Sequence, residues 1–146
     1  MQNVLFNIEN TLGFAVHKSS YLIKQCVKRV IEKEGIRATA EDFMLMALLD
    51  EVGVPQAILL QKTGKDKTTL ARQIDRLAQK NWVIRVQTHD DRRSQEILLT
   101  SRGAVIKEKM IDSVKKCIAE AIAGIDPVAI EDARKVLIKV ANNLRN

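Results

Sequence analysis

The sequence predicts a mainly α-helical domain that carries one small β-hairpin, and three observations support this fold class. Apolar residues recur at helical spacing over long stretches at both ends of the 146-residue chain. A shorter amphipathic helix is predicted over residues 66–80. Two short apolar runs follow it, 82–86 and 97–99, and a long polar tip separates them. A helix followed by a hairpin with a basic tip is the outline of a winged helix-turn-helix, here flanked by long helices.

Length and composition narrow the class of protein. A chain of 146 residues is one domain by size and can bury a core. We expect a cytoplasmic protein without a membrane partner, because no apolar stretch approaches the ~20 residues of a membrane helix and no signal peptide is evident. Cys26 and Cys117 lack metal or redox spacing, so two reduced, partly buried thiols are expected. His17 and His89 have no ligand-spaced partners, so no enzyme, metal or cofactor is expected.

The net charge of +6 is concentrated in one part of the chain. Residues 55–107 hold 11 of the 24 Lys and Arg residues but only five of the 18 Asp and Glu residues. A basic excess in the segment that contains the helix and hairpin favours a polyanionic partner. Trp82 is the one aromatic residue of this segment, so recognition of single strands or RNA by base stacking is not expected.

The N-terminal region predicts one long helix. Its apolar stripe runs from Leu5 to Ile31, and Gly35 suits the C-terminal cap. A stripe of roughly seven turns is too long to be buried within a small DNA-binding module. This helix therefore needs other long helices as packing partners.

Two further helices are predicted before the amphipathic one. Thr39 begins a signal that resembles a capping box, with Asp42 at the third helical position. The nearly continuous apolar run 43–49 indicates a helix that is buried on most sides. A short helix over 56–63 follows, and Gly64 closes it with a turn that needs a positive φ.

The amphipathic helix begins after Asp66, which is suited to the N-cap. Its predicted core face is Leu70, Ile74 and Leu77. The polar residues on its other faces are Lys67, Thr68, Thr69, Arg72, Gln73 and Arg76. Arg and Gln side chains have the fork geometry for guanine and adenine edges, so we expect Arg72 and Gln73 to contact bases in a major groove.

Two helices are predicted after the hairpin. Thr100 caps the first, whose apolar stripe extends to Ile122. Asp126 and Pro127 supply the N-cap and first position of the last helix, which extends to Leu144. Because the helices at both ends carry wide apolar stripes, we expect them to form a bundle between two subunits.

Several short motifs occur in a fixed order and spacing. They are Asp66-Lys67-Thr68-Thr69-Leu70, Arg76-Leu77, Arg85 six residues before Asp91, Asp91-x-Arg93, and Leu99-Thr100-x-x-Gly103. Each motif is weak alone. Together they resemble the MarR family of bacterial transcriptional regulators, and the resemblance covers nearly the whole chain.

The resemblance implies a homodimer in which residues 1–36 and 104–146 form dimerisation helices around a winged helix-turn-helix at 37–103. It further implies a transcriptional regulator that binds a pseudo-palindromic double-stranded operator, acting as a repressor that a small-molecule effector releases. The family pattern assigns minor-groove insertion to Arg93 and its orientation to Asp91. The candidate DNA-binding residues are then Lys67, Thr68, Thr69, Arg72, Gln73, Arg76, Arg85, Asp91, Arg92 and Arg93.

Three positions depart from the family pattern. Leu60 stands where the family has alanine, which implies different packing between the helices. Asn81 replaces a glycine, although asparagine tolerates left-handed geometry. The motif Ile8-Glu9-Asn10-x-Leu12 resembles the hydroperoxide-sensing branch, but Gly13 occupies the position of that branch's reactive cysteine. Sensing by that cysteine is therefore not expected.

Alternatives stay open on three points. Phe14, His17 and Tyr21 lie on a second face of the N-terminal helix, where they either pack against the partner subunit or line an effector pocket. The protein could instead be a redox-responsive regulator that uses Cys26 or Cys117. A third possibility is an interaction protein that keeps this fold but does not bind DNA.

Overall fold

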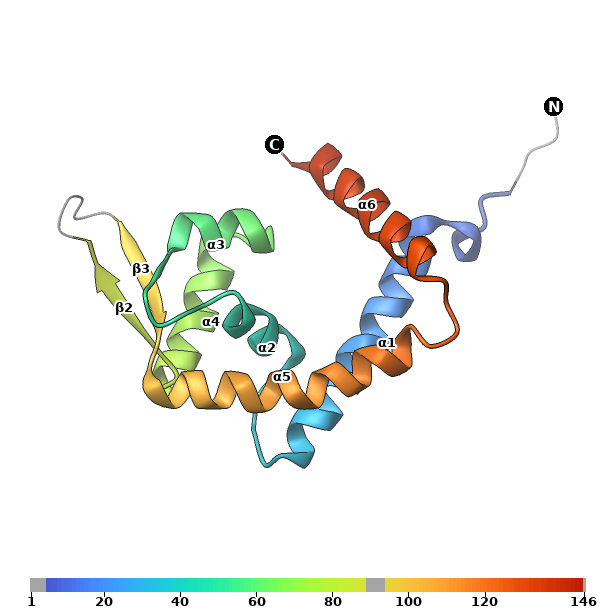
Figure 1. Cartoon of the computed structure of the whole chain (residues 1–146). Helices are drawn as coiled ribbons and strands as arrows, with labels where there is room; N and C mark the ends of the chain where they lie inside the picture. The colour runs from blue at the N-terminus through green and yellow to red at the C-terminus, as the bar shows by residue number, and fades with distance from the viewer. Residues whose placement is uncertain (1–4, 89–93, 146) are drawn as a thin grey trace.

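The computed structural model describes residues 5–88 and 94–145 and confirms the mainly helical class with a small sheet. Its elements in chain order are η1 (Ile8–Asn10), α1 (Leu12–Lys33), α2 (Ala40–Ala47), β1 (Val54–Pro55), α3 (Gln56–Thr63), α4 (Lys67–Gln79), β2 (Val83–Gln87), β3 (Gln95–Leu99), α5 (Ser101–Ala121) and α6 (Pro127–Leu144). Figure 1 shows α5 running from the hairpin to α1, with α2, α3, α4 and the sheet at one end and α6 at the other. None of the described helices has the length and apolarity needed to cross a membrane.

The N-terminal helix begins later than the apolar stripe predicts. It starts at Leu12, because the hydroxyl of Thr11 accepts the backbone N–H of Phe14 at 3.1 Å and acts as the N-cap. Before it lies the short 3-10 turn η1, in which the side chain of Asn7 accepts the N–H of Glu9. The prediction of one continuous helix from Leu5 is therefore wrong at its start.

The predicted start of α2 and the predicted turns after α3 and α4 are confirmed. Thr39 and Asp42 form a complete capping box, with each side chain accepting the backbone N–H of the other residue. Gly64 ends α3 in the left-handed conformation at φ +68°. Asn81 adopts a φ of +63° at the exit from α4, as its side chain permits.

The sheet has three strands in the order β1-β3-β2. The predicted hairpin is present, and its antiparallel register runs from Val83 opposite Leu99 to Gln87 opposite Gln95. The third strand, β1, was not predicted, because two residues are too short for a periodic signal. It pairs with β3 through Val54 opposite Ile97 and places α3 against the central strand.

The core lies where α2, α3, α4 and the sheet meet, and the middle of α5 and the C-terminal half of α1 complete it. Its fully buried side chains include Ile31, Leu45, Met46, Leu49, Leu59, Leu70, Ile74, Leu77, Ile97 and Met110. Leu60, the departure from the family pattern, is partly buried and packs against this core. By contrast, α6 has no buried residue among those described, and it leaves Val136 and Leu137 exposed.

The start of α5 lies against the backbone of Trp82, which connects α4 to β2. A Cβ atom on Gly103 would lie 1.9 Å from the carbonyl oxygen of Trp82, so this helical position has room only for glycine. The backbone N–H of Thr100 donates to the same carbonyl at 3.0 Å. The Thr100 hydroxyl also donates to the carbonyl of Asn81 at 2.5 Å. These contacts fix the hairpin and α5 to the C-terminal end of α4.

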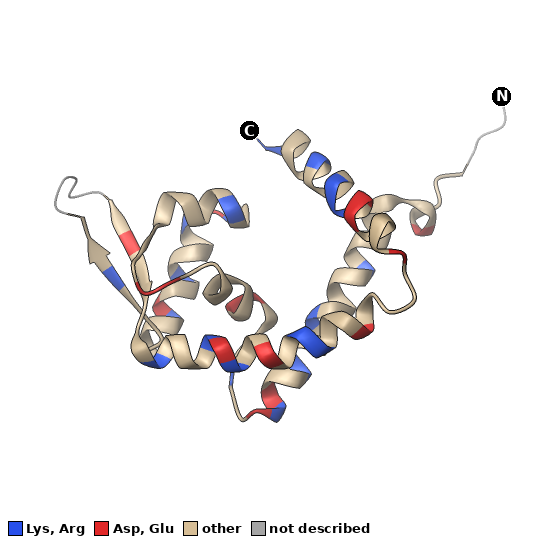
Figure 2. Ribbon diagram, in the orientation of Figure 1, with Lys and Arg blue, Asp and Glu red and all other residues tan. Residues whose placement is uncertain are grey.

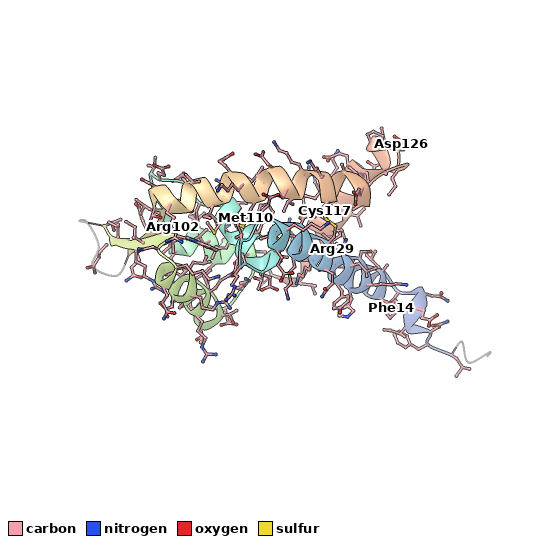
Figure 3. All side chains as sticks on the ribbon, turned by 90° about the horizontal axis from the view of Figure 1, so that it is seen from below. Phe14, Arg29, Arg102, Met110, Cys117 and Asp126 are labelled. Atoms are coloured by element: carbon pink, nitrogen blue, oxygen red, sulfur yellow. A yellow bond between two sulfur atoms is a disulfide. The ribbon has the colours of Figure 1, made fainter. Side chains whose placement is uncertain are left out.

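The expectation of two free thiols is wrong in this structure. Cys26 on α1 and Cys117 on α5 form a disulfide with a Cα–Cα distance of 6.3 Å, although 91 positions separate them in the sequence. Figure 3 shows Cys117 where α5 passes along α1. Packing of α1 against α5 brings the two cysteines together. Their spacing in the sequence does not predict this contact.

Candidate nucleic-acid interface

The helix α4 is anchored at its start by Asp66. The Asp66 carboxylate accepts the backbone N–H and the hydroxyl of Thr69, both at 2.8 Å. The backbone hydrogen bond from Thr69 is the main cause that holds the pKa of Asp66 below its usual value, so this cap stays ionised at neutral pH. An anionic cap also complements the positive end of the helix dipole.

Three polar residues in the first two turns of α4 face solvent. They are Lys67, Thr68 and Arg72, and all three are exposed. Thr69 is also exposed, but its hydroxyl is engaged with Asp66. Figure 2 shows Lys and Arg segments on α4 and on β2 of the adjoining hairpin. An exposed basic surface therefore lies on the helix that the sequence predicts to enter a major groove.

Gln73 occupies a different place from the predicted one. Its side chain is only 3% exposed. The amide nitrogen donates to Asp42 at 3.2 Å, and the amide oxygen accepts from Lys65 at 2.7 Å. Both ends of the amide are thus bonded within the protein, and the structure does not support the prediction that Gln73 contacts bases.

Helical spacing explains this correction. Position 73 stands three residues after Leu70 and four before Leu77, so it completes the i, i+3, i+4, i+7 set that defines one helix face. All four members of that set are buried. The spacing alone places residue 73 on the core face, although its polar residue type favours the surface.

Arg76 and Arg85 both form ion pairs within the chain. Arg76 donates to Asp42 at 3.0 Å and stays 57% exposed, so part of its guanidinium is accessible to solvent. Arg85, on β2, donates to Asp75 at 2.5 Å and to the carbonyl of Ala71 at 3.0 Å. These bonds tie β2 to α4. Neither arginine is as free as Lys67 or Arg72.

The roles predicted for Asp91, Arg92 and Arg93 fall on residues outside the described ranges. The β2–β3 register ends with Gln87 opposite Gln95, and beyond it the backbone N–H of Thr88 donates to the carbonyl of Ser94 at 3.2 Å.

The candidate effector residues differ in exposure, and none of them lines the apolar cavity on α1. Phe14 is half-buried, whereas His17 and Tyr21 are exposed, with Tyr21 at 59%. An apolar cavity of about 500 Å³ instead adjoins another face of α1. Its lining comes from α1, α2 and α6: Leu12, Ala15, Val16, Ser19, Ser20, Ile23, Lys24, Met44, Ala133, Val136 and Leu137. Sequence periodicity did not single out this lining, because α6 contributes part of it.

Known proteins resemble this chain over most of its length. The model of the MarR family matches residues 39–95. The organic hydroperoxide resistance transcriptional regulator of Bacillus subtilis (strain 168) is 29% identical over 133 residues, which cover 88% of this chain and 84% of that protein.

Solved structures share the fold at lower identity. A mutant of MarR from E. coli complexed with operator DNA is 24% identical, with a TM-score of 0.80, over 93% of this chain and 97% of that one. CouR from Rhodococcus jostii RHA1 bound to p-coumaroyl-CoA is 18% identical, with a TM-score of 0.80, over 96% and 98% of the two chains.

Proposed function

We propose that this chain is a transcriptional regulator of the MarR family, which binds a double-stranded operator as a homodimer and represses transcription until a small molecule releases it. The match of the MarR family model to residues 39–95 and the similarity to a curated regulator support this proposal. The observation that carries the proposal is the solvent-facing basic start of α4, held on a helix-turn-helix scaffold by the Asp66 cap. Such a regulator would act in the cytoplasm, where bacterial DNA lies.

In this proposal α4 enters the major groove. Arg72 is the best-placed base-reading residue, since an exposed guanidinium can donate two hydrogen bonds to a guanine edge. Lys67 and Thr68, at the start of the helix, would contact phosphates and base edges. Arg76 and Arg85 would contribute positive charge while keeping their internal partners. Arg92 and Arg93, with Asp91, remain proposed for the wing.

A second copy of the chain is the proposed cover for the apolar surfaces at the end remote from the hairpin. Exposed large apolar residues gather on three elements there: Leu12, Val16 and Leu22 on α1, Ile118 on α5, and Val136, Leu137 and Val140 on α6. Exposed apolar residues that gather in this way are typical of an interaction surface. A two-fold dimer would present two α4 helices to a pseudo-palindromic site. Sedimentation at low micromolar concentration should therefore find a dimer, and a folded monomer would contradict this part.

The cavity between α1, α2 and α6 supports the effector part of the proposal. Its lining is mostly apolar, which suits an apolar small molecule. Lys24, which also contributes to the lining, is paired with Glu41 at 3.0 Å. CouR, which shares the fold, is known with p-coumaroyl-CoA bound. Phe14, His17 and Tyr21 stay candidates for contacts to an effector or to the partner subunit.

A redox-responsive regulator is the second candidate. The Cys26–Cys117 disulfide favours it, as does the similarity to a regulator named for organic hydroperoxide resistance. The two candidates differ in the signal that releases DNA, since the second requires a change at these cysteines.

The test of the proposal begins with selection of bound fragments from the genome of origin. Fluorescence anisotropy on a selected operator would then compare Arg72→Ala with Lys115→Ala, an exposed cation on α5. Loss of a bidentate base contact should weaken binding by about 1–3 kcal/mol and relax preference at a defined position. Lys115→Ala should have little effect. Equal loss in both variants, or no selected operator at all, would contradict the proposal.

A further inference from the structure

Two adjacent carboxylates on α2 lie between the dimerisation helix α1 and the recognition helix α4. Asp42 is only 4% exposed, and its carboxylate receives three hydrogen bonds. One comes from the Thr39 backbone, and the other two come from Gln73 and Arg76 on successive turns of α4. Asp42 therefore holds α4 from its inner side at two points.

Glu41, the neighbouring residue, contacts α1 and the turn before α4. One carboxylate oxygen accepts from Lys24 on α1 at 3.0 Å, and the other accepts from Lys65 at 3.4 Å. Lys65, in the turn before α4, also donates to Gln73. The hydrogen bond from Lys24 is the main cause that lowers the pKa of Glu41, so this bridging carboxylate is ionised at neutral pH.

These contacts form one continuous polar chain from α1 to α4. Its members, in order of contact, are Lys24, Glu41, Lys65, Gln73, Asp42 and Arg76. Charge-assisted hydrogen bonds of this kind have defined directions. The chain therefore adds directional contacts between α1 and α4 to the packing of the core.

We propose that Glu41 and Asp42 are positioning residues for operator binding, which set the placement of α4 relative to the dimerisation helix α1. The proposal rests on the proposed function, because α1 of each subunit would belong to the dimer interface. In a dimer, the orientation of α4 relative to α1 sets the distance between the two recognition helices. Glu41 and Asp42 would therefore determine which half-site spacing the dimer prefers, without contacting DNA themselves.

The change in DNA affinity when Glu41 loses its charge distinguishes the positioning role from a purely electrostatic one. Glu41 borders a small polar cavity together with Lys65, Arg72 and Arg76, so it adds negative charge beside the exposed face of α4. Removing that charge would strengthen DNA binding if charge alone mattered. Positioning predicts weaker binding, because α4 loses its link to α1.

The central experiment compares Glu41→Gln with Glu51→Gln, the same change at an exposed position outside the polar chain. Anisotropy is measured on the selected operator and on versions with one base pair added or removed at its centre. Glu41→Gln should weaken binding to the selected operator by about two- to fivefold, as expected for a partly exposed ion pair. It should also reduce discrimination against altered spacing, a readout that general destabilisation does not change. Glu51→Gln should match the wild type.

A double-mutant comparison tests whether the effect passes through Glu41. Lys24→Met on α1 should weaken operator binding by a similar factor in the wild type. In the Glu41→Gln background it should add nothing, because the contact it removes is already lost. Additive effects would overturn the proposal and would indicate loss of positive charge alone.

Asp42→Asn provides a second, more deeply placed variant. It keeps the shape of the side chain but removes the charge opposite Arg76. Weaker binding with a shifted spacing preference supports the proposal. The positioning role is wrong if wild type binds its operator and both variants behave like the control. In that case Glu41→Gln and Asp42→Asn would show the affinity and spacing preference of Glu51→Gln. If the wild type binds no operator, the proposed function itself fails.

Discussion

Replacing Gly103 with alanine should destabilise the protein severely. The new Cβ would lie 1.9 Å from the carbonyl oxygen of Trp82 and 2.8 Å from its carbonyl carbon. Non-bonded heavy atoms settle near ~3.5 Å, so α5 would have to move away from Trp82. That movement breaks the hydrogen bond from Thr100 to the same carbonyl.

The two costs can be combined. Overpacking typically costs about 1–3 kcal/mol, and a polar group left without its partner costs about 1–3 kcal/mol. We therefore expect the free energy of unfolding to fall by about 2–6 kcal/mol. A typical domain has only about 5–15 kcal/mol in total.

Urea denaturation followed by the fluorescence of Trp82, the one tryptophan, measures this loss directly. Protein concentration must be held constant, since the proposed dimerisation would contribute to stability. Gly13→Ala is the matched control, because it lies in the first turn of α1 with nothing within 4 Å of the added atom. It should be neutral or slightly stabilising, as alanine favours helix over glycine. Equal midpoints for the two variants would refute the reasoning.

Three further predictions concern other positions. Gln73→Ala should lower the free energy of unfolding by about 1–3 kcal/mol, because the buried Asp42 loses a hydrogen-bond donor. It should not change base preference at any single operator position, and a base-specific loss of affinity in anisotropy would restore the prediction that Gln73 contacts bases. Thiol titration of the denatured, unreduced protein should find no free thiol, because Cys26 and Cys117 form a disulfide. Reduction should lower the unfolding midpoint, since the disulfide closes a long loop. Two free thiols in protein purified without reductant would contradict the disulfide. The pKa of Asp66 is lowered by folding, so the stability it contributes is present above its unfolded pKa and is lost as pH falls through the lower folded value. The difference in melting temperature between wild type and Asp66→Asn should therefore shrink at acidic pH, and a constant difference would argue against the cap.

Local signals predicted the helix starts well. Thr39, Asp66 and Thr100 act as N-caps because their side chains accept nearby backbone N–H groups, an interaction that depends only on residues within one turn. Leu5 was assigned to α1 for the opposite reason: apolar periodicity continued past the true cap at Thr11. A cap signal outweighs periodicity where the two disagree.

Contacts between distant segments set the limit of sequence-based prediction. The Cys26–Cys117 disulfide and the pairing of Glu41 with Lys24 depend on how α1 packs against α5 and α2. No spacing rule encodes that packing. The exposed Lys67 and Arg72 could be placed because α4 is strongly amphipathic, and their roles in DNA binding stay predictions.

The short strand β1 has a consequence for how the protein avoids aggregation. It forms one edge of the sheet and consists of two residues, the second of which is Pro55. Proline has no N–H to offer a further strand, and so short an edge gives little template for one. Arg85 anchors the strand at the opposite edge, β2, to α4. Both edges of the sheet are thus poor sites for pairing with a strand of another molecule, in a chain that exposes several large apolar side chains.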